Sequence, residues 1–145
     1  MVILPHRTYK ILILFDNKLI DYDEIKNNIK FMEEWTRDLK KELNRQYKIV
    51  FDRLESLREL RGKIEKLHGE IKIGEHTIDL FSDRVNDDIR IIFSVFKRTR
   101  KVVVWGIDHH EKAYGKIIRH AEGFIKNQKN QEKILELLGI KMTRR

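Results

Sequence analysis

The chain has 145 residues and a formal net charge of +8, with 41% hydrophobic and 37% charged residues. This length predicts one domain over residues 1–145, and the hydrophobic content argues against a wholly disordered chain. Because there is no cysteine, disulfide frameworks, thiolate metal sites and cysteine nucleophiles are excluded. No stretch has the roughly 18 uncharged apolar residues of a membrane-spanning helix, and the first residues lack a secretory leader, so we expect a soluble cytoplasmic protein.

The first half of the chain predicts one strand followed by helix. Residues 8–15 (TYKILILF) have the Ile and Leu content of a buried strand, and Asp16 and Asn17 indicate a turn. From residue 23 to residue 67, apolar side chains recur three or four positions apart with charges between them, which is the helical period. Two interpretations fit: two antiparallel helices that break near Asn44, which we favour, or one long helix in a coiled coil.

The second half predicts a meander of strands followed by helices. Strands are expected over residues 77–85, 89–96 and 101–107, and their short connections imply antiparallel pairing. Asp108 with Glu111 resembles a capping box, which predicts a helix starting there. A last helix is expected over residues 131–138, ending at Gly139. The predicted class is therefore α+β.

Polar residues with possible chemistry gather at the predicted ends of the strands and the following helix. Arg90 interrupts an apolar strand, which fits an outward-facing residue or a ligand for phosphate. His109 and His110 could exchange a proton near neutral pH, although local hydrogen bonding alone would also explain them. Tyr114 could lie over the same face or simply pack with a solvated hydroxyl. Adjacent histidines cannot present one helix face to a metal and no phosphate-binding glycine loop is present, so we expect neither metal nor cofactor.

Three segments together resemble one known family. The runs KLHG (66–69), DLFSDRVNDDIRIIF (79–93) and KVVVWGIDHHEKAY (101–114) are similar to the RelE/ParE toxin superfamily, especially its RelE and HigB branches. The resemblance implies a helical hairpin packed on a small antiparallel sheet, in the order strand, two helices, three strands. It covers about residues 8–124, which leaves residues 125–145 as a C-terminal helical extension. An inserted EIKIGEHTI segment after Gly69, and Asp108 and His110 in place of a glycine and a basic residue, depart from the family pattern.

The resemblance also implies a function and roles for residues. Relatives in the RelE branch cleave mRNA, commonly on the ribosome and without metal, by attack of a ribose 2′-hydroxyl on the adjacent phosphate. Arg90 would then stabilise the phosphate and His109 would act as acid or base, with His110 as its substitute. Tyr114 would stack on a base or assist proton transfer. The basic residues expected to hold flanking phosphates are Arg84, Lys66, Lys63 and Arg61. A cognate antitoxin, mRNA and the ribosome are the implied partners.

Two other functions fit the same sequence. A protein of the ParE branch would use this fold to bind DNA gyrase without cleaving RNA. Alternatively, a basic helical adaptor would bind nucleic acid through charge alone, which requires residues 23–67 to form one helix.

Overall fold

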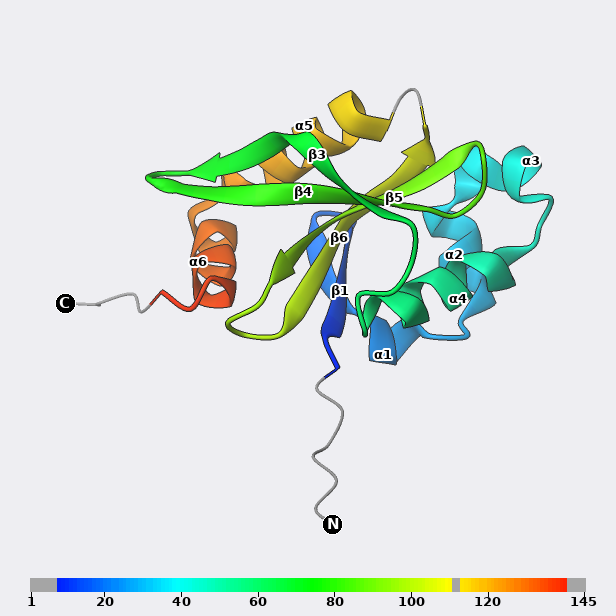
Figure 1. The fold of residues 1–145 in the computed structure, drawn as a ribbon, viewed down its shortest axis with the longest axis horizontal. Coiled ribbons are helices and arrows are strands. Elements are labelled where there is room, and N and C mark those ends of the chain that lie inside the picture. Colours follow the sequence, from blue (N-terminus) through cyan, green and yellow to red (C-terminus); the bar gives the residue numbers. More distant parts are fainter. Residues whose placement is uncertain (1–7, 111–112, 141–145) are drawn as a thin grey trace, which may run out of the picture.

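The computed structural model describes residues 8–110 and 113–140. Within these residues, one six-stranded sheet has the spatial order β2-β1-β6-β5-β4-β3 (Figure 1). Its strands are β1 (Lys10–Phe15), β2 (Lys18–Asp21), β3 (Ile64–Ile73), β4 (His76–Arg84), β5 (Ile89–Phe96) and β6 (Lys101–His109). The predicted α+β class and meander are confirmed. The purely antiparallel sheet is wrong, because β1 runs parallel to β6 while the other neighbouring strands are antiparallel.

Two strands, β2 and β3, were not predicted. The Asp16–Asn17 turn has φ values of 51° and 60°, so it is tight enough to fold β2 directly back on β1. β3 begins at Ile64, inside the region expected to be helical, and pairs with β4 around a turn at Gly74 and Glu75. The inserted EIKIGEHTI segment is therefore the tip of a β3–β4 hairpin.

The predicted helical hairpin is present only as short segments. These are α1 (Tyr22–Ile25), α2 (Ile29–Trp35), the 3₁₀ turn η1 (Arg37–Leu39), α3 (Lys40–Leu43) and α4 (Tyr47–Leu57). Asn28 caps α2 by accepting a hydrogen bond from the amide of Phe31. Asn44 and Arg45 have left-handed backbones that separate α3 from α4. The break near Asn44 is thus confirmed, whereas the single long helix, and the coiled coil built on it, are wrong.

The helices cover both faces of the sheet (Figure 1). The segments from α1 to α4 cover what we call the first face, and α5 (Ala113–Ile125) and α6 (Gln128–Leu137) cover the second face. Along β5, Ile91 and Phe93 belong to the first core and Ile92 to the second, because neighbouring residues of a strand point to opposite sides. The C-terminal extension also builds the second core, since Ile134 and Leu137 of α6 are buried in it.

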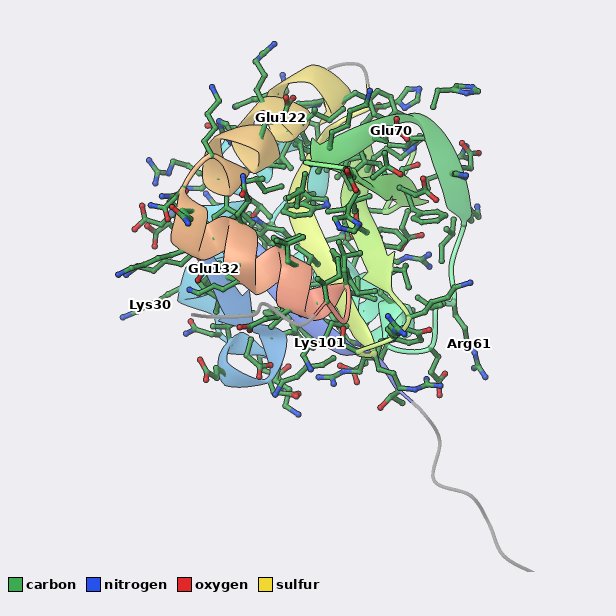
Figure 2. The ribbon with its side chains drawn as sticks, turned by 90° about the vertical axis from the view of Figure 1, so that its left-hand side faces the viewer. Lys30, Arg61, Glu70, Lys101, Glu122 and Glu132 are labelled. Carbon is green, nitrogen blue, oxygen red and sulfur yellow. The ribbon has the colours of Figure 1, made fainter. Side chains whose placement is uncertain are left out.

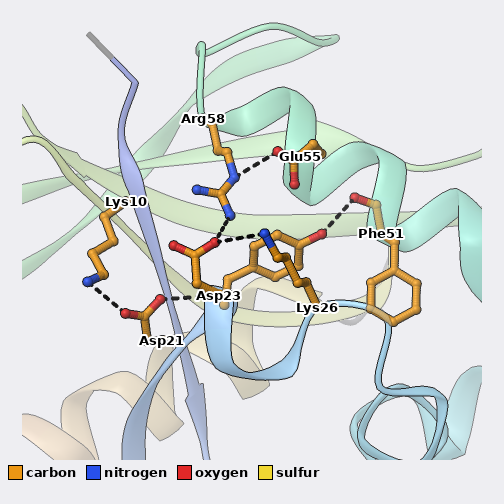
Figure 3. A network of polar contacts seen from close by, with 8 residues as sticks. Lys10, Asp21, Asp23, Lys26, Phe51, Glu55 and Arg58 are labelled. Atoms are coloured by element: carbon orange, nitrogen blue, oxygen red, sulfur yellow. Dashed lines mark hydrogen bonds and ion pairs between the residues drawn. The ribbon is translucent and has the colours of Figure 1, made fainter.

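A polar network fastens the first-face helices to one another (Figure 3). Arg58, just after α4, forms ion pairs with Asp23 of α1 and with Glu55, and its guanidinium lies over the Tyr22 ring at 5.1 Å. The Tyr22 hydroxyl donates to the carbonyl of Phe51 at 3.4 Å. These contacts connect α1 with α4 through residues that are 29 and 35 positions apart in the sequence.

The first of the second-face helices starts later than expected, whereas the last one ends as expected. Asp108 lies within β6, and its carboxylate accepts from the amide of His109 at 2.7 Å, so the predicted capping box at Asp108 is wrong. Its other member, Glu111, lies outside the described residues. Asn127 caps α6, and Gly139, with φ 81°, ends the helical segment as predicted. Among the described residues, no helix is long and apolar enough to cross a bilayer.

Candidate functional site

Three of the strands place Arg84, Arg90 and Asp108 side by side. Arg84 of β4 is paired with Arg90 of β5, and Arg90 is paired with Asp108 of β6. Cross-strand partners share a face, and Ile92, two residues after Arg90, belongs to the second core. The three side chains therefore leave the sheet on the second face, at the end where the β4–β5 turn lies.

The guanidinium of Arg90 is occupied by its own turn. Arg90 is 8% exposed, and its Nη1 donates to the carbonyls of Asn86 at 2.8 Å and of Ile89 at 3.2 Å. Asn86 also closes the turn by accepting from the amides of Asp88 and Ile89. The interruption of the apolar strand by an arginine is thus explained by this turn, which Arg90 holds in place.

His109 lies on the opposite face from Arg90. It follows Asp108 in β6, so its side chain points to the first face, where Nε2 lies 3.3 Å from Oε1 of Glu42 in α3. The structure therefore does not bring His109 and Arg90 onto one face. Nor do the two histidines begin a helix: His109 ends β6, and α5 begins at Ala113.

His110 and Tyr114 lie nearer to the two arginines. His110 is exposed, and its amide donates to the carbonyl of Asp88 at 2.7 Å, which docks it on the turn that Arg90 holds. Tyr114, in the first turn of α5, packs partly buried against the second core. Arg84 is half-buried, and its side chain has no hydrogen bond or ion pair with another described residue. Arg84, the β4–β5 turn and His110 thus form one corner of the molecule, which we call the turn corner, with Tyr114 on the same face.

The remaining predicted phosphate ligands are dispersed. Lys66 of β3 lies 3.6 Å from Asp79 in an exposed ion pair. Arg61 is paired with Glu59, and Figure 2 shows it at the outer side of the molecule, away from α6. The side chain of Lys63 is exposed, and its amide donates to Asp83. These three residues lie in the loop that leads into β3 and in β3 itself, which is an edge strand. They do not line a common pocket.

A crevice that the sequence did not reveal lies beside the turn corner. It has a volume of about 570 Å³ and opens where β1 and β6 end, between α2 and η1 on one side and α5 on the other. Asp108 lines it, so the crevice and the arginine row share a residue. Its walls come from four segments far apart in the chain, which is why no local motif announces it.

The chemistry available at this end of the sheet is that of anion contact and proton transfer. Arg84 offers a guanidinium, which suits phosphate oxygens, and the exposed His110 offers an imidazole. Among the described residues, no group of three or more His, Cys, Asp or Glu side chains is arranged to hold a metal ion.

Comparison with known proteins assigns the chain to no family. No protein-family model matches the chain. No curated protein and no solved structure matches it either.

Proposed function

We propose that the protein is a RelE-like toxin that cleaves RNA without a metal ion, with its reactive site at the turn corner. The observation that carries the proposal is the row of Arg84, Arg90 and Asp108 across three strands, with His110 docked on the same turn. The net charge of +8 favours a polyanionic substrate, because cations that neutralise phosphates release bound counterions.

The order of elements is consistent with this proposal. Along the chain, β1 and β2 are followed by the first-face helices, by the antiparallel strands β3 to β6, and by α5 and α6; the part of this order that supports the proposal is β1, the helices and the last three strands. The parallel pairing of β1 with β6 brings the end of the meander beside the first strand. β2, β3 and α6 are additions to that plan in this chain.

The contacts favour a different division of roles from the one that the sequence suggested. Arg90 holds the turn through carbonyl oxygens, so Arg84 is the guanidinium available to the scissile phosphate. His109 is engaged by Glu42 on the other face, so His110 becomes the candidate for proton transfer. Tyr114 would assist from α5 by stacking on a base or donating its phenolic proton.

In the proposed reaction, the ribose 2′-oxygen forms a bond to phosphorus and the bond from phosphorus to the 5′-oxygen breaks. His110 would take the 2′-hydroxyl proton or supply the proton that the leaving 5′-oxygen needs, and Arg84 would stabilise the charge on the phosphoryl oxygens. The products would be a 2′,3′-cyclic phosphate and a free 5′-hydroxyl. An acidic antitoxin that covers the turn corner would neutralise the activity.

The test is cleavage of mRNA in a translating extract, with the termini of the fragments identified chemically. We expect the wild-type protein to yield cyclic phosphates, and Arg84→Ala and His110→Ala each to lower the rate on the order of 10²-fold. The control is Lys97→Ala, which removes the same charge from an exposed site in the β5–β6 turn.

Two results would overturn the proposal. One is wild-type cleavage no greater than that of the Arg84→Ala, His110→Ala double variant. The other is inhibition of gyrase supercoiling with RNA left intact, which would assign the protein to the gyrase-directed branch instead.

A further inference from the structure

The crevice beside the turn corner lies at the carboxyl ends of two neighbouring parallel strands. β1 and β6 are parallel neighbours, so both end at the crevice. The chain continues from the β1–β2 hairpin to helices on the first face, and from β6 to α5 on the second face. At this end of the sheet, α2 and η1 line the crevice from the first face and α5 lines it from the second, so the carboxyl ends of β1 and β6 lie between helices of the two faces. The volume of about 570 Å³ falls within the range of small-molecule sites.

The floor of the crevice is rigid and aromatic. Trp105 lies within it, 2% exposed, and its indole nitrogen donates to the hydroxyl of Ser94 at 2.8 Å, which fixes the ring. Trp35, at the end of α2, lines the opposite side and is only partly buried. Its ring centroid lies 6.3 Å from that of Phe31, in a tilted arrangement. A flat ligand entering the crevice would therefore meet the partly exposed ring of Trp35, with the buried ring of Trp105 beneath the lining.

The rim of the crevice carries charges of both signs. On α5, Arg119 and His120 follow Lys116 by three and four residues, so both lie on the same side of the helix as Lys116. Carboxylates line the remaining rim, and these are Asp16, Glu34, Asp38 and Asp108, with Arg37 among them. Apart from Asp108, the side chains of these residues have no hydrogen bond or ion pair to another residue in the described part of the chain. The rim therefore holds donors for an anion and acceptors for hydroxyl or amino groups, both free to serve a ligand.

We propose that this crevice binds a ribonucleoside monophosphate, either as a free nucleotide or as one unit of a single-stranded RNA. Trp35 would stack on the base, and Lys116 and Arg119 would hold the phosphate. Carboxylates of Asp38 and Asp108 would accept hydrogen bonds from ribose hydroxyls or base amino groups. The four carboxylates of the rim repel a ligand more strongly the more negative charge it carries. A monophosphate therefore fits this rim better than a triphosphate.

The chain has two tryptophans, and both line the crevice, so intrinsic fluorescence reports on this site directly. The experiment is titration of the full chain with AMP, GMP, CMP and UMP, excited at 295 nm and corrected for absorption with a free tryptophan analogue. We expect a saturable change with at least one nucleotide, weaker binding of its triphosphate, and no comparable change with inorganic phosphate.

Variants separate binding at the crevice from binding through general charge. Arg119→Ala and Lys116→Ala should each weaken the binding about tenfold, because each removes a charge-assisted hydrogen bond. Lys129→Ala, which removes an exposed charge on α6, should leave it unchanged. Trp35→Phe should weaken binding measured by calorimetry, while its circular dichroism remains that of the wild type.

The source of the nucleotide is decided by a second titration with an unmodified single-stranded tetraribonucleotide, measured on the Arg84→Ala, His110→Ala double variant, which keeps the crevice and lacks the proposed cleavage residues. Tighter binding of the tetranucleotide than of the monophosphate identifies an RNA subsite, and equal or weaker binding identifies a site for free nucleotide. The proposal is overturned if no nucleotide gives a saturable change, if phosphate alone reproduces it, or if Arg119→Ala and Lys129→Ala bind equally.

Nucleotide binding at the crevice does not depend on RNA cleavage. Arg84→Ala alters the turn corner and leaves every rim residue in place, so it should bind the monophosphate as the wild type does. Loss of cleavage with retained nucleotide binding in Arg84→Ala would thus concern the reactive site alone. Loss of nucleotide binding with retained cleavage in Arg119→Ala would concern the crevice alone.

Discussion

The two faces of the sheet hold their helices by different means. On the first face, charged groups reach between helices and strands: Asp83 of β4, 0% exposed, receives two hydrogen bonds from Arg53 of α4, at 3.1 and 2.5 Å. On the second face, α5 docks through apolar side chains, and Ile117 lies so close to β6 that a Cβ on Gly106 would come within 2.9 Å of it.

The helices of the two faces also differ in how continuous their apolar stripe is. The first-face α-helices have between 4 and 11 residues, and α6 on the second face has 10, so all of them depend on packing against the sheet. α5 has 13 residues with a continuous apolar stripe, so burial suffices to orient it. The proposed sites lie at the end of the sheet where these two kinds of packing meet.

The largest effect is expected from breaking the second face. Phe124 of α5 is 1% exposed in the second core, so Phe124→Ala should lower the free energy of unfolding by about 3–5 kcal/mol, measured by urea denaturation. The adjacent Gly123 is exposed, with nothing within 4 Å of an added Cβ. Gly123→Ala should therefore be neutral or stabilising by up to about 1 kcal/mol, and a loss comparable to that of Phe124→Ala would show that the helix is not docked in this way.

Breaking the main anchor of the first face should cost slightly less. Asp83→Ala leaves Arg53 without its carboxylate and the amide of Lys63 without its acceptor, so we expect a loss of about 3 kcal/mol. The matched variant is Asp79→Ala in the same strand, whose pairing with Lys66 is exposed and should be worth less than about 1 kcal/mol. Equal losses in the two variants would contradict the anchoring role.

Periodicity predicted the elements of the fold whose neighbours lie close along the chain. Residues 89–96 form β5 as predicted, because a nearly continuous apolar run between two turn signals marks both of its ends. The start of β3 at Ile64 could not be read, because apolar residues at 54, 57 and 64 continue a helical spacing that the backbone leaves after Leu57. The parallel pairing of β1 with β6 joins residues about 90 apart, which no local pattern reports.

For the candidate site, the sequence indicated which residues take part more readily than it indicated the face of the sheet to which each side chain points. Arg84 and Arg90 were named from the sequence and do lie side by side. The face to which His109 points depends on the length of β6, which continues two residues beyond the predicted strand and includes Asp108 and His109. Because side chains alternate along a strand, this extension places His109 beside Glu42 instead of Arg90.

Alkaline pH should destabilise the packing of the first face, where Tyr22 lies. Burial raises the pKa of Tyr22 to about 12, with the carboxylate of Glu55 adding to the effect. A folded-state pKa above the unfolded value of 10.0 stabilises the fold below pH 10, and this stabilisation is lost as the pH rises toward 12. We expect a loss on the order of 1 kcal/mol across this range, absent in Tyr22→Phe. Absorbance titration should show one tyrosine ionising about two pH units after an exposed one.

The smallest effect is expected from the exposed part of the Arg58 network at acid pH. The hydrogen bond from Arg58 holds the pKa of Asp23 below its ordinary value of 3.8, with Lys26 contributing to the same direction. The carboxylate therefore stabilises the fold above about pH 4, and this contribution disappears as the pH falls through the folded-state pKa. Urea midpoints measured from pH 5 to pH 2.5 should fall less steeply in Asp23→Asn than in the wild type, whereas Asp87→Asn, in the β4–β5 turn, should retain the wild-type slope. Because Asp23 is partly exposed, the difference will be small, and equal slopes in Asp23→Asn and the wild type would show that this ion pair does not help to hold α1.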